Sequence, residues 1–362
     1  DIMRKPFKPN YLPIELNSAD TIEILKLEGE ARARVERFNS ILERSIIKKE
    51  LLMLFSMNES VQSTKIEGTQ ASFSDVMESE VTGNKNKDIT EVFNYFDALT
   101  KAEDLLKQIP ISTRMFLKLH EIILKDSRGQ NRSPGSYRKI QNFIGPTNKI
   151  EDATYIPPEP TLVAEYMTNL EKYINDEYED NFGHITRAAI IHGQFETIHP
   201  FLDGNGRLGR MLIIIYLLDK GIISYPSFFV SEELEKSRYK YYALLNGLRL
   251  EKPKWKEWII FFLNASIKQA DKYIEKLVAI ERLYNDIMVI AKVKGISDEA
   301  VLFIFNKPIF TINKMKEMTG VSYNTARRYV SELVESGKIY GDDKKRNTMY
   351  SFYDLIDIII RA

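Results

Sequence analysis

Apolar residues recur at the three- and four-residue spacing of α-helices along most of this chain. In one stretch Ile185, Ala188, His192 and Phe195 fall on a single helical face. The pattern therefore predicts a mainly α protein. The helical segments it predicts are residues 19–57, 92–106, 113–125, 161–173, 185–198, 206–218, 232–245 and 255–291.

One internal stretch departs from the helical pattern. Residues 131–138 are polar and contain Pro134 and Gly135, and they precede an apolar segment, 140–144. A polar turn and a second apolar segment, 153–156, follow before Pro157. Turn residues between short apolar runs are typical of a β-hairpin, so we expect one at residues 140–158.

The last part of the chain has a pattern of its own. Gly295 and Ser297 supply a break and a fresh helix cap, and the rest predicts a short helix, two further helices around Gly320, and two short strands. This order resembles a winged helix-turn-helix domain, with Ser322 capping its second helix. The expected divisions are 1–108 (N-terminal helical region), 109–250 (catalytic domain), 251–296 (helical linker) and 297–362 (winged-helix domain).

Composition restricts the class of protein. The 362 residues are 44% hydrophobic and 28% charged, which suffices for a buried core and for more than one domain. Lysine plus arginine equals aspartate plus glutamate at 51 each, so no overall charge attracts nucleic acid or membrane. There are no cysteines, which excludes thiol catalysis and disulfides. The longest apolar run, 211–218, is too short to span a membrane, and we expect a cytoplasmic protein whose natural N-terminus lies a few residues before Asp1.

The chemistry is concentrated in residues 199–210. This stretch combines a base, a carboxylate, an amide, three glycines and two arginines directly before the apolar run 211–218. The glycines therefore fall where a helix begins, and free backbone N–H groups and the helix dipole favour an anion there. Such a site suits phosphate, with a carboxylate for Mg²⁺, arginines for further phosphate charge and a histidine for proton transfer. The residues concerned are His199, Asp203, Gly204, Asn205, Gly206, Arg207, Gly209 and Arg210.

Residues 204–209 also fit the G-x-G-x-x-G pattern of dinucleotide-binding sites. That pattern requires a preceding strand and a βαβ unit. Here the preceding residues 185–198 are helical and no alternation of strands and helices surrounds them. We therefore discount the match to a dinucleotide site. A plain glycine-rich turn is also disfavoured, because a turn does not need these polar residues together.

The whole segment resembles the signature of the Fic-domain (filamentation-induced-by-cAMP) family, H-x-F-x-[DE]-G-N-G-R-x-x-R, with every fixed position met. The resemblance implies an all-helical core that transfers AMP from ATP to a hydroxyl of a target protein. It implies that His199 is the general base and that Asp203 binds Mg²⁺. Gly204, Asn205 and Gly206 are then expected to surround the phosphates, and Arg207 and Arg210 to bind the outer phosphates.

A second resemblance lies far upstream. Residues 63–68 fit the inhibitory motif [ST]-x-x-x-E-[GN] that many Fic proteins carry on a helix. It implies that Ser63, Glu67 and Gly68 form an inhibitory element, with Glu67 paired to Arg207 in the place of the γ-phosphate. Alone, the pattern is common and indicates only a helix that ends at a glycine.

Further site residues follow from the same resemblance. The hairpin of residues 140–158 corresponds to a flap on whose edge an extended target segment adds a strand, and Ile144 and Gly145 border the nucleotide. Tyr241, Tyr242 and Asn246 are candidates for the adenine pocket, although an aromatic pair on a helix is more often core. His120, His184 and His192 have no metal-site spacing, and we expect His120 and His192 to be packing or surface residues.

Two functions of different class remain. The favoured one is an autoinhibited protein adenylyltransferase that uses ATP and Mg²⁺, with self-modification and homodimer formation both compatible with it. The alternative is a winged-helix transcriptional regulator with a nucleotide-responsive Fic module, in which residues 297–362 contact DNA. The same residues could instead bind a protein partner. Lys344, Lys345 and Arg346 would lie at the wing tip, but Glu332, Glu335, Asp342 and Asp343 dilute the basic surface.

Overall fold

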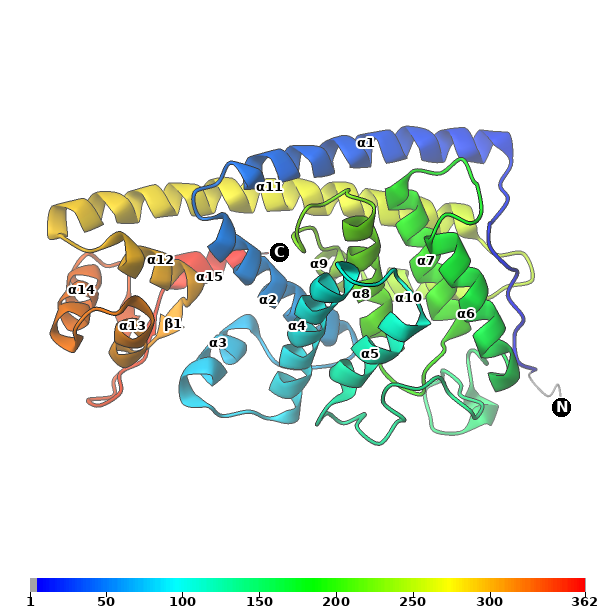
Figure 1. Ribbon diagram of the computed structural model, residues 1–362, viewed down its shortest axis with the longest axis horizontal. Helices are drawn as coiled ribbons and strands as arrows, with labels where there is room; N and C mark the ends of the chain where they lie inside the picture. Colours follow the sequence, from blue (N-terminus) through cyan, green and yellow to red (C-terminus); the bar gives the residue numbers. More distant parts are fainter. Residues whose placement is uncertain (1–4, 362) are drawn as a thin grey trace.

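The protein is built almost entirely of helices. The computed structural model describes residues 5–361. Two long helices, α1 (Ser18–Glu43) and α11 (Trp255–Lys294), run side by side along one edge of the molecule, and most other helices lie beneath them (Figure 1). The mainly α fold class is confirmed. The segment predicted as a linker, 251–296, is largely α11, which packs along α1 and α7 (His184–Ile198).

The remaining helices of the larger part surround a central pair. This pair is α7 and α8 (Asn205–Asp219), which contact each other closely and contact α11 and α4 respectively. Fourteen of the fifteen residues of α7 are buried, as expected for a helix enclosed on all sides. The helices around this pair are α2 (Lys48–Ile66), α3 (Phe73–Thr82), α4 (Lys87–Leu106), α5 (Thr113–Leu124), α6 (Pro160–Ile174), α9 (Ser231–Lys236) and α10 (Arg238–Gly247).

Two predicted helices differ from the structure, and one helix was not predicted. The expected helix 19–57 is divided into two helices, because the chain turns at residues 44–47. Ile47 is buried in this turn, and α2 then runs away from α11. The expected helix 232–245 is divided at Ser237 into α9 and α10. Helix α3 was missed, although the capping box of Ser72 and Asp75 marks its start.

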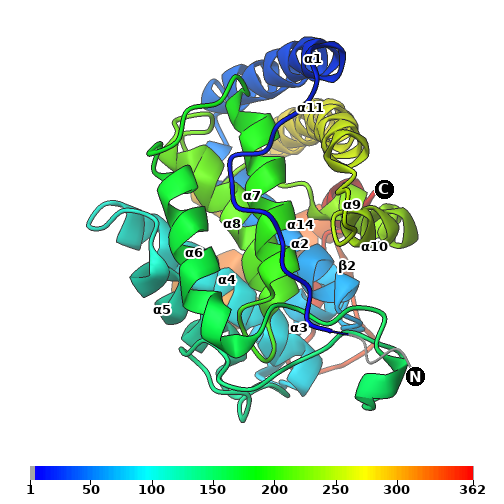
Figure 2. The same ribbon diagram turned by 90° about the vertical axis from the view of Figure 1, so that its right-hand side faces the viewer.

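The predicted hairpin of residues 140–158 is wrong as a two-stranded ladder. It is reduced to one antiparallel bridge between Ile144 and Tyr155, with a short 3₁₀ helix, η1 (Ile150–Asp152), in the turn. The chain between these two residues is almost all exposed, and few side chains are buried that would stabilise longer strands. Figure 2 shows this segment as an irregular loop below α6.

The C-terminal unit contains the predicted three helices and two strands in the predicted order, together with a strand at Ile309–Phe310 and a last helix at Tyr353–Ile360 that were not predicted. A three-stranded antiparallel sheet of order β1-β3-β2 joins β1 (Ile309–Phe310), β3 (Tyr350–Ser351) and β2 (Tyr340–Gly341). Ser297 and Ser322 cap α12 and α14 as expected, and Gly295 ends α11 in a left-handed conformation. The helices of this unit are α12 (Asp298–Asn306), α13 (Ile312–Thr319), α14 (Tyr323–Glu335) and α15 (Tyr353–Ile360). Its assignment to the winged-helix class, like the other domain limits, stays a prediction.

Candidate active site

The motif of residues 199–210 forms the turn between the two central helices and the first turns of α8. Helix α7 ends at Ile198, and His199 adopts a left-handed conformation with φ 51°. Helix α8 begins at Asn205 after Gly204, whose φ is 81°. The predicted helix start therefore lies where the glycines indicated, and its free N–H groups face the end of the loop.

The side chains of Asn205 and His120 stabilise this loop. Oδ1 of Asn205 accepts a hydrogen bond from the N–H of Phe201 at 2.9 Å, and its Nδ2 donates to the carbonyl of Phe201 at 2.8 Å. The ring of His120 stacks on Phe201 with 3.8 Å between ring centroids. Asn205 thus braces the loop, and its side-chain amide is already used within the protein.

His120 also contacts the backbone of Asp203. The N–H of Gly135 donates to Nδ1 of His120, so Nε2 carries the proton and donates to the carbonyl of Asp203 at 2.8 Å. Burial lowers the pKa of His120 to about 4, which keeps the ring neutral. Sequence reasoning assigned His120 to packing and missed this contact, because residues 120 and 203 are far apart in the chain.

The segment of residues 63–68 lies against the start of α8. Glu67 follows the last residue of α2, and a Cβ atom added to Gly206 would overlap its Oε1. A glycine at this position therefore leaves room for an anionic group directly over the helix N-terminus. In this structure the carboxylate of Glu67 is that group.

The arginine paired with Glu67 is Arg210, so the prediction of Arg207 is wrong. Oε1 of Glu67 lies 2.7 Å from Nη2 of Arg210, which also donates to the carbonyl of Ser63 at 2.9 Å. Nε of Arg210 donates to the hydroxyl of Ser63 at 2.9 Å. The face of α8 that carries Arg210 is the one beside α2, while Arg207 lies one turn nearer the loop and reaches Asp203.

Arg207 and Asp203 form the outer part of the site. Nη2 of Arg207 lies 3.4 Å from Oδ1 of Asp203, which also accepts the N–H of Gly204 at 2.6 Å. Arg207 is only 5% exposed, and its Nε and Nη1 have no hydrogen-bond partner within residues 5–361. Two buried, unpaired donors of an arginine suit the oxygens of a phosphate.

His199 lies at the opposite end of the loop. Burial, followed by the positive charges of Arg249 and Arg138, lowers the pKa of its imidazole to about 3. The ring is therefore neutral near pH 7 and can accept a proton. Its Nδ1 is buried and has no hydrogen-bond partner in the described part of the chain.

The comparisons with known proteins agree with this arrangement. A sequence profile of the Fic/DOC family matches residues 110–217, and one of the Fic/DOC family N-terminal region matches residues 25–104. Together the two matches cover about half of the chain.

This protein belongs to the Fic/DOC family.

Curated relatives include "Protein adenylyltransferase Fic" of Drosophila willistoni, 26% identical over 170 residues, which are 47% of this chain and 30% of that protein. The protein of the same name from Drosophila melanogaster is also 26% identical, over 47% of this chain and 31% of its own length. The matched part thus spans about a third of these relatives.

Among solved structures, a Fic family protein from Desulfovibrio desulfuricans G20 aligns with a TM-score of 0.58 and 18% identity, over 94% of this chain and 98% of that chain. Fic-1 from C. elegans aligns with a TM-score of 0.52 and 22% identity, over 71% and 73% of the two chains. These likenesses show that the fold is that of Fic proteins.

A magnesium ion is the cofactor that this family resemblance implies. Within the described residues no three histidine, aspartate or glutamate side chains lie together as a metal-binding group. Mg²⁺ is commonly held by one or two carboxylates together with substrate phosphates. The half-exposed carboxylate of Asp203, beside the helix N-terminus, fits that use as a single protein ligand.

The flap residues lie on the far side of the loop. Ile144 pairs with Tyr155, and a Cβ atom on Gly145 would lie 2.9 Å from the carbonyl of Asp152, so the turn needs glycine there. The hydroxyl of Tyr155 donates to the carbonyl of Thr197 at 2.6 Å, which fixes the flap to α7. One bridge leaves most of the flap backbone without a ladder partner.

The structure separates the three adenine-pocket candidates. Tyr241 is 1% exposed, and its hydroxyl lies 2.6 Å from Nε2 of His192 within the core. Tyr242 is half-exposed and donates to the carbonyl of Ile66 at 3.2 Å, beside Glu67. Asn246 is exposed and accepts from Arg249. Tyr242 therefore contacts the end of α2, while Tyr241 fills the core, as aromatic residues on a helix more often do.

Glu196 is a site residue that sequence reasoning left out. It is 5% exposed, its Oε1 has no hydrogen-bond partner within residues 5–361, and a Cβ atom on Gly209 would overlap that oxygen. Burial raises the pKa of this carboxyl to about 7, although Arg210 opposes the shift. A carboxyl three residues before His199 was visible in the sequence, but its burial was not.

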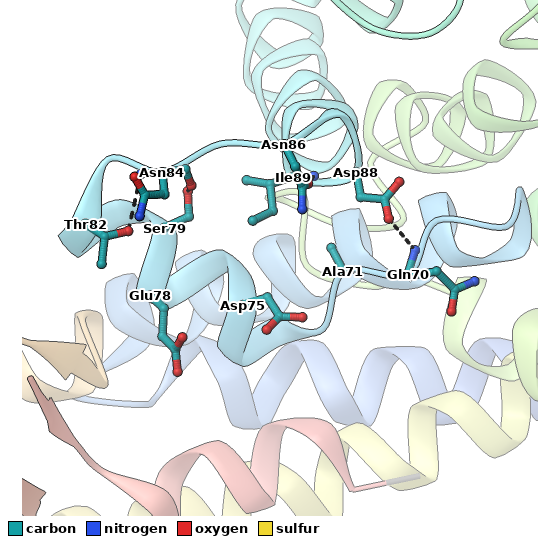
Figure 3. Close-up of a pocket in the computed structure, with 10 residues that line it drawn as sticks. All are labelled: Gln70, Ala71, Asp75, Glu78, Ser79, Thr82, Asn84, Asn86, Asp88 and Ile89. Atoms are coloured by element: carbon teal, nitrogen blue, oxygen red, sulfur yellow. Dashed lines mark hydrogen bonds between the residues drawn. The ribbon is translucent and has the colours of Figure 1, made fainter. Parts of the chain in front are cut away.

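A separate polar pocket lies beyond the inhibitory motif. It has a volume of about 370 Å³ and is formed by α3, the start of α4 and the segment after Gly68 (Figure 3). Asp75 and Asp88 on its wall cap the backbone N–H groups of Ser72 and Gln70. These carboxylates have structural partners, and the pocket does not contain any residue of the 199–210 motif.

Proposed function

We propose that this protein transfers AMP from ATP to a hydroxyl of a target protein and that Glu67 inhibits the reaction. The observation that supports the proposal best is the anion already present at the start of α8. Glu67 lies over Gly206 and pairs with Arg210, while two donors of Arg207 are unpaired nearby. A site that holds a carboxylate in this way has the charge and the N–H groups to hold phosphate.

The proposed chemistry needs one proton acceptor and several phosphate ligands. The neutral imidazole of His199 takes the proton from the target hydroxyl, whose oxygen forms a bond to the α-phosphorus of ATP as the bond to the β-phosphate oxygen breaks. Pyrophosphate leaves, and His199 later releases the proton to solvent. General-base help of this kind contributes about 10²–10⁴-fold to a rate.

Charge neutralisation supplies most of the remaining catalysis in phosphoryl and nucleotidyl transfer. The N–H groups at Gly204 and Gly206 and the guanidinium of Arg207 are the proposed phosphate ligands. Mg²⁺, held by Asp203 and the phosphates, would supply further positive charge. Arg210 becomes available to a phosphate only when Glu67 moves away.

Target recognition is proposed to use the flap. Its backbone groups outside the bridge of Ile144 and Tyr155 have few partners, so an extended segment can add a strand there. An exposed loop of the same protein would bind in the same way, so self-modification belongs to the proposal, and so does a homodimer that presents one copy to the other. A cytoplasmic setting also belongs to the proposal. Within residues 5–361 no helix is long and apolar enough to cross a membrane.

The C-terminal unit is proposed to be a winged-helix domain. Its order of helices and its antiparallel β1-β3-β2 sheet support that class. Lys344, Lys345 and Arg346 are exposed between β2 and β3, but Arg328 of α14 is bound to the carbonyls of Lys294 and Gly295. Arg328 therefore caps α11, which favours a role in fixing this unit over a role in DNA contact.

One incubation tests the proposed function against the regulator alternative. The Glu67→Gly variant is incubated with Mg²⁺, α-labelled ATP and cell lysate, and protein-bound label is measured. The adenylyltransferase predicts label that survives denaturation. The regulator predicts no label and salt-sensitive, sequence-dependent retention of DNA fragments.

A further inference from the structure

Four consecutive carbonyls around His199 are bound by one short segment of the chain. The side chain of Arg138 donates from Nε to the carbonyl of His199 at 2.8 Å and from Nη2 to that of Ile198 at 3.3 Å. The backbone N–H of Arg138 donates to the carbonyl of Pro200 at 2.9 Å. Asn142 then binds the carbonyl of Phe201 at 3.0 Å.

These carbonyls need such partners because α7 ends here. The last carbonyls of a helix receive no hydrogen bond from an N–H group of that helix, so buried ones require donors from elsewhere. His199 in addition adopts a left-handed conformation with φ 51°, which is unfavourable for a residue with a Cβ atom. A strained conformation of this kind persists only where its surroundings fix it.

Arg138 is an unusual choice for a buried helix cap. It is 2% exposed and has no carboxylate partner within the described residues, and its Nη1 has no hydrogen-bond partner there. Burial lowers its pKa to about 10, so it is still a cation at neutral pH. A buried, incompletely bonded cation costs stability, and a neutral side chain of similar size would avoid that cost.

The same guanidinium fixes a second segment. Its Nη2 donates at 2.5 Å to the carbonyl of Pro158, the last residue of the flap, just before α6. One planar group thus joins the end of α7, the turn of His199 and the base of the flap. A lysine, with a single nitrogen, does not reach all three carbonyls in this fixed geometry.

We propose that Arg138 is a positioning residue for His199, which holds the left-handed turn that carries the imidazole and fixes that turn to the flap. The inference rests on the proposed function for the role of His199. Arg138 acts through the backbone of residues 198–200 and does not contact the reacting atoms. Its charge also acts on the imidazole together with that of Arg249, while the backbone of Glu196 on α7 contacts the ring.

The structure offers a matched control. Arg187 is also buried, at 6% exposed, and its Nη2 donates at 2.8 Å to the carbonyl of Tyr173 at the end of α6. It lies in the first turn of α7, at the opposite end of that helix from His199. Arg138→Met removes the cost of a buried cation but leaves three carbonyls without this donor, and Arg187→Met leaves the buried Asp180 without its ion-pair partner. Both variants should therefore lower the free energy of unfolding, but only Arg138→Met should disturb His199.

The kinetic test uses the Glu67→Gly protein as the parent. We expect Arg138→Met to lower kcat about 100-fold, the loss that a misplacement of about 1 Å produces, with KM for ATP within about threefold of the parent. Arg138→Lys should also lower kcat, because it keeps the charge and loses the three-way contact. Equal kcat in Arg138→Met and Arg187→Met, with both folded, would overturn the proposal.

An NMR measurement needs no activity and so separates this inference from the proposed function. The Cα chemical shift of His199, assigned by comparison with His199→Ala, reports its backbone conformation. We expect it to leave the left-handed range in Arg138→Met and Arg138→Lys and to be unchanged in Arg187→Met. If the Cα shift of His199 is unchanged in both Arg138 variants, the positioning role is refuted, even if AMP transfer is present. If the shift changes in a protein that does not transfer AMP, the positioning role is supported and only the proposed function is refuted. If Arg138→Met does not fold, Arg138→Lys alone decides.

Discussion

Glu67, at the end of α2, and Arg210, in α8, form an ion pair with 2.7 Å between Oε1 and Nη2, although the two residues lie 143 positions apart in the chain. Arg210 is 1% exposed, and burial acts to lower its pKa, but the charges of Glu67, Tyr241, Tyr242 and Glu196 together raise it well above the usual range. Arg210 therefore stays positively charged at neutral pH. Its contact with Glu67 ties the end of α2 to the start of α8.

Removal of Glu67 should increase AMP transfer. A hydrogen bond to a charged group contributes about 1.5–3 kcal/mol, so Glu67→Gly should raise the rate about 10- to 100-fold at limiting ATP. Glu67→Gln keeps the shape and loses the charge, and it should give a smaller increase. The measurement is the initial rate of label transfer from α-labelled ATP. A variant no faster than the parent would count against autoinhibition.

Gly206 should be essential for the binding of any anion at the start of α8. In Gly206→Ala the new methyl group occupies the position of Glu67 Oε1, so it excludes both the carboxylate and a phosphate. In the Glu67→Gly background we expect Gly206→Ala to weaken ATP binding at least about tenfold in calorimetry, a difference of about 1.4 kcal/mol. Gly221→Ala is a control for a glycine far from the loop, with nothing near its Cβ position, although its φ of 69° makes it strained. Unchanged ATP affinity in Gly206→Ala would contradict the placement of the phosphates.

Glu196 should make stability depend on pH. The folded pKa of its carboxyl is about 7, above the usual value of 4.5, so the folded state binds more protons than the unfolded state between these values. Its contribution to stability therefore falls as pH rises from 4.5 to 7, and the loss is complete above 7. Glu196→Gln does not ionise and should raise the midpoint of thermal unfolding at pH 8 but change it little at pH 5. An equal effect at both pH values would show that ionisation of Glu196 is not the cause.

Lys276 should couple the C-terminal helix to the rest of the protein. Its Nζ lies 3.0 Å from Oε2 of Glu232 and donates at 2.8 Å to the carbonyl of Ile359 in α15. Lys276 is 4% exposed, so Lys276→Met leaves a buried carboxylate and should cost about 3–5 kcal/mol in denaturant unfolding. Lys272→Met, one turn away and 3.8 Å from Glu232, should cost much less.

Hydrogen exchange gives the local readout of the same change. Amides of α15 should exchange faster in Lys276→Met than in the parent, because one of the contacts that hold this helix is lost. Exchange in α15 that matches the parent, together with a small loss of stability, would contradict the coupling.

The sequence predicted most of what is local. Gly204 and the apolar run after Arg210 placed the start of α8, and Ser297, Gly295 and Ser322 placed the limits of three helices, because caps and breaks depend on a few neighbouring residues. The breaks at residues 44–47 and at Ser237 carry no proline or glycine and were not predicted. Packing against α11 and α9 decides where these breaks occur, and the helical spacing of apolar residues does not reveal that packing.

The parts of the site that come from distant segments were predicted least well. The choice between Arg207 and Arg210 as the partner of Glu67 depends on the rotation of α8 relative to α2, which spacing alone does not give. His120 and Arg138 bind backbone carbonyls of the loop, and such contacts leave no mark in the identity of the residues they hold. The flap was expected as a hairpin, but turn residues between short apolar runs do not ensure a ladder where the backbone is exposed.

The central claim is transfer of the α-phosphate with its adenosine, with Glu67 as the inhibitor and His199 as the base. The direct measurement incubates the parent, Glu67→Gly and Glu67→Gly/His199→Ala proteins with Mg²⁺ and ATP labelled at either the α- or the γ-phosphate. The account predicts protein-bound label from α-labelled ATP only, strongest in Glu67→Gly and absent from the double variant, whose fold is checked by circular dichroism. Label from γ-labelled ATP, or equal α-label with and without His199, would contradict it.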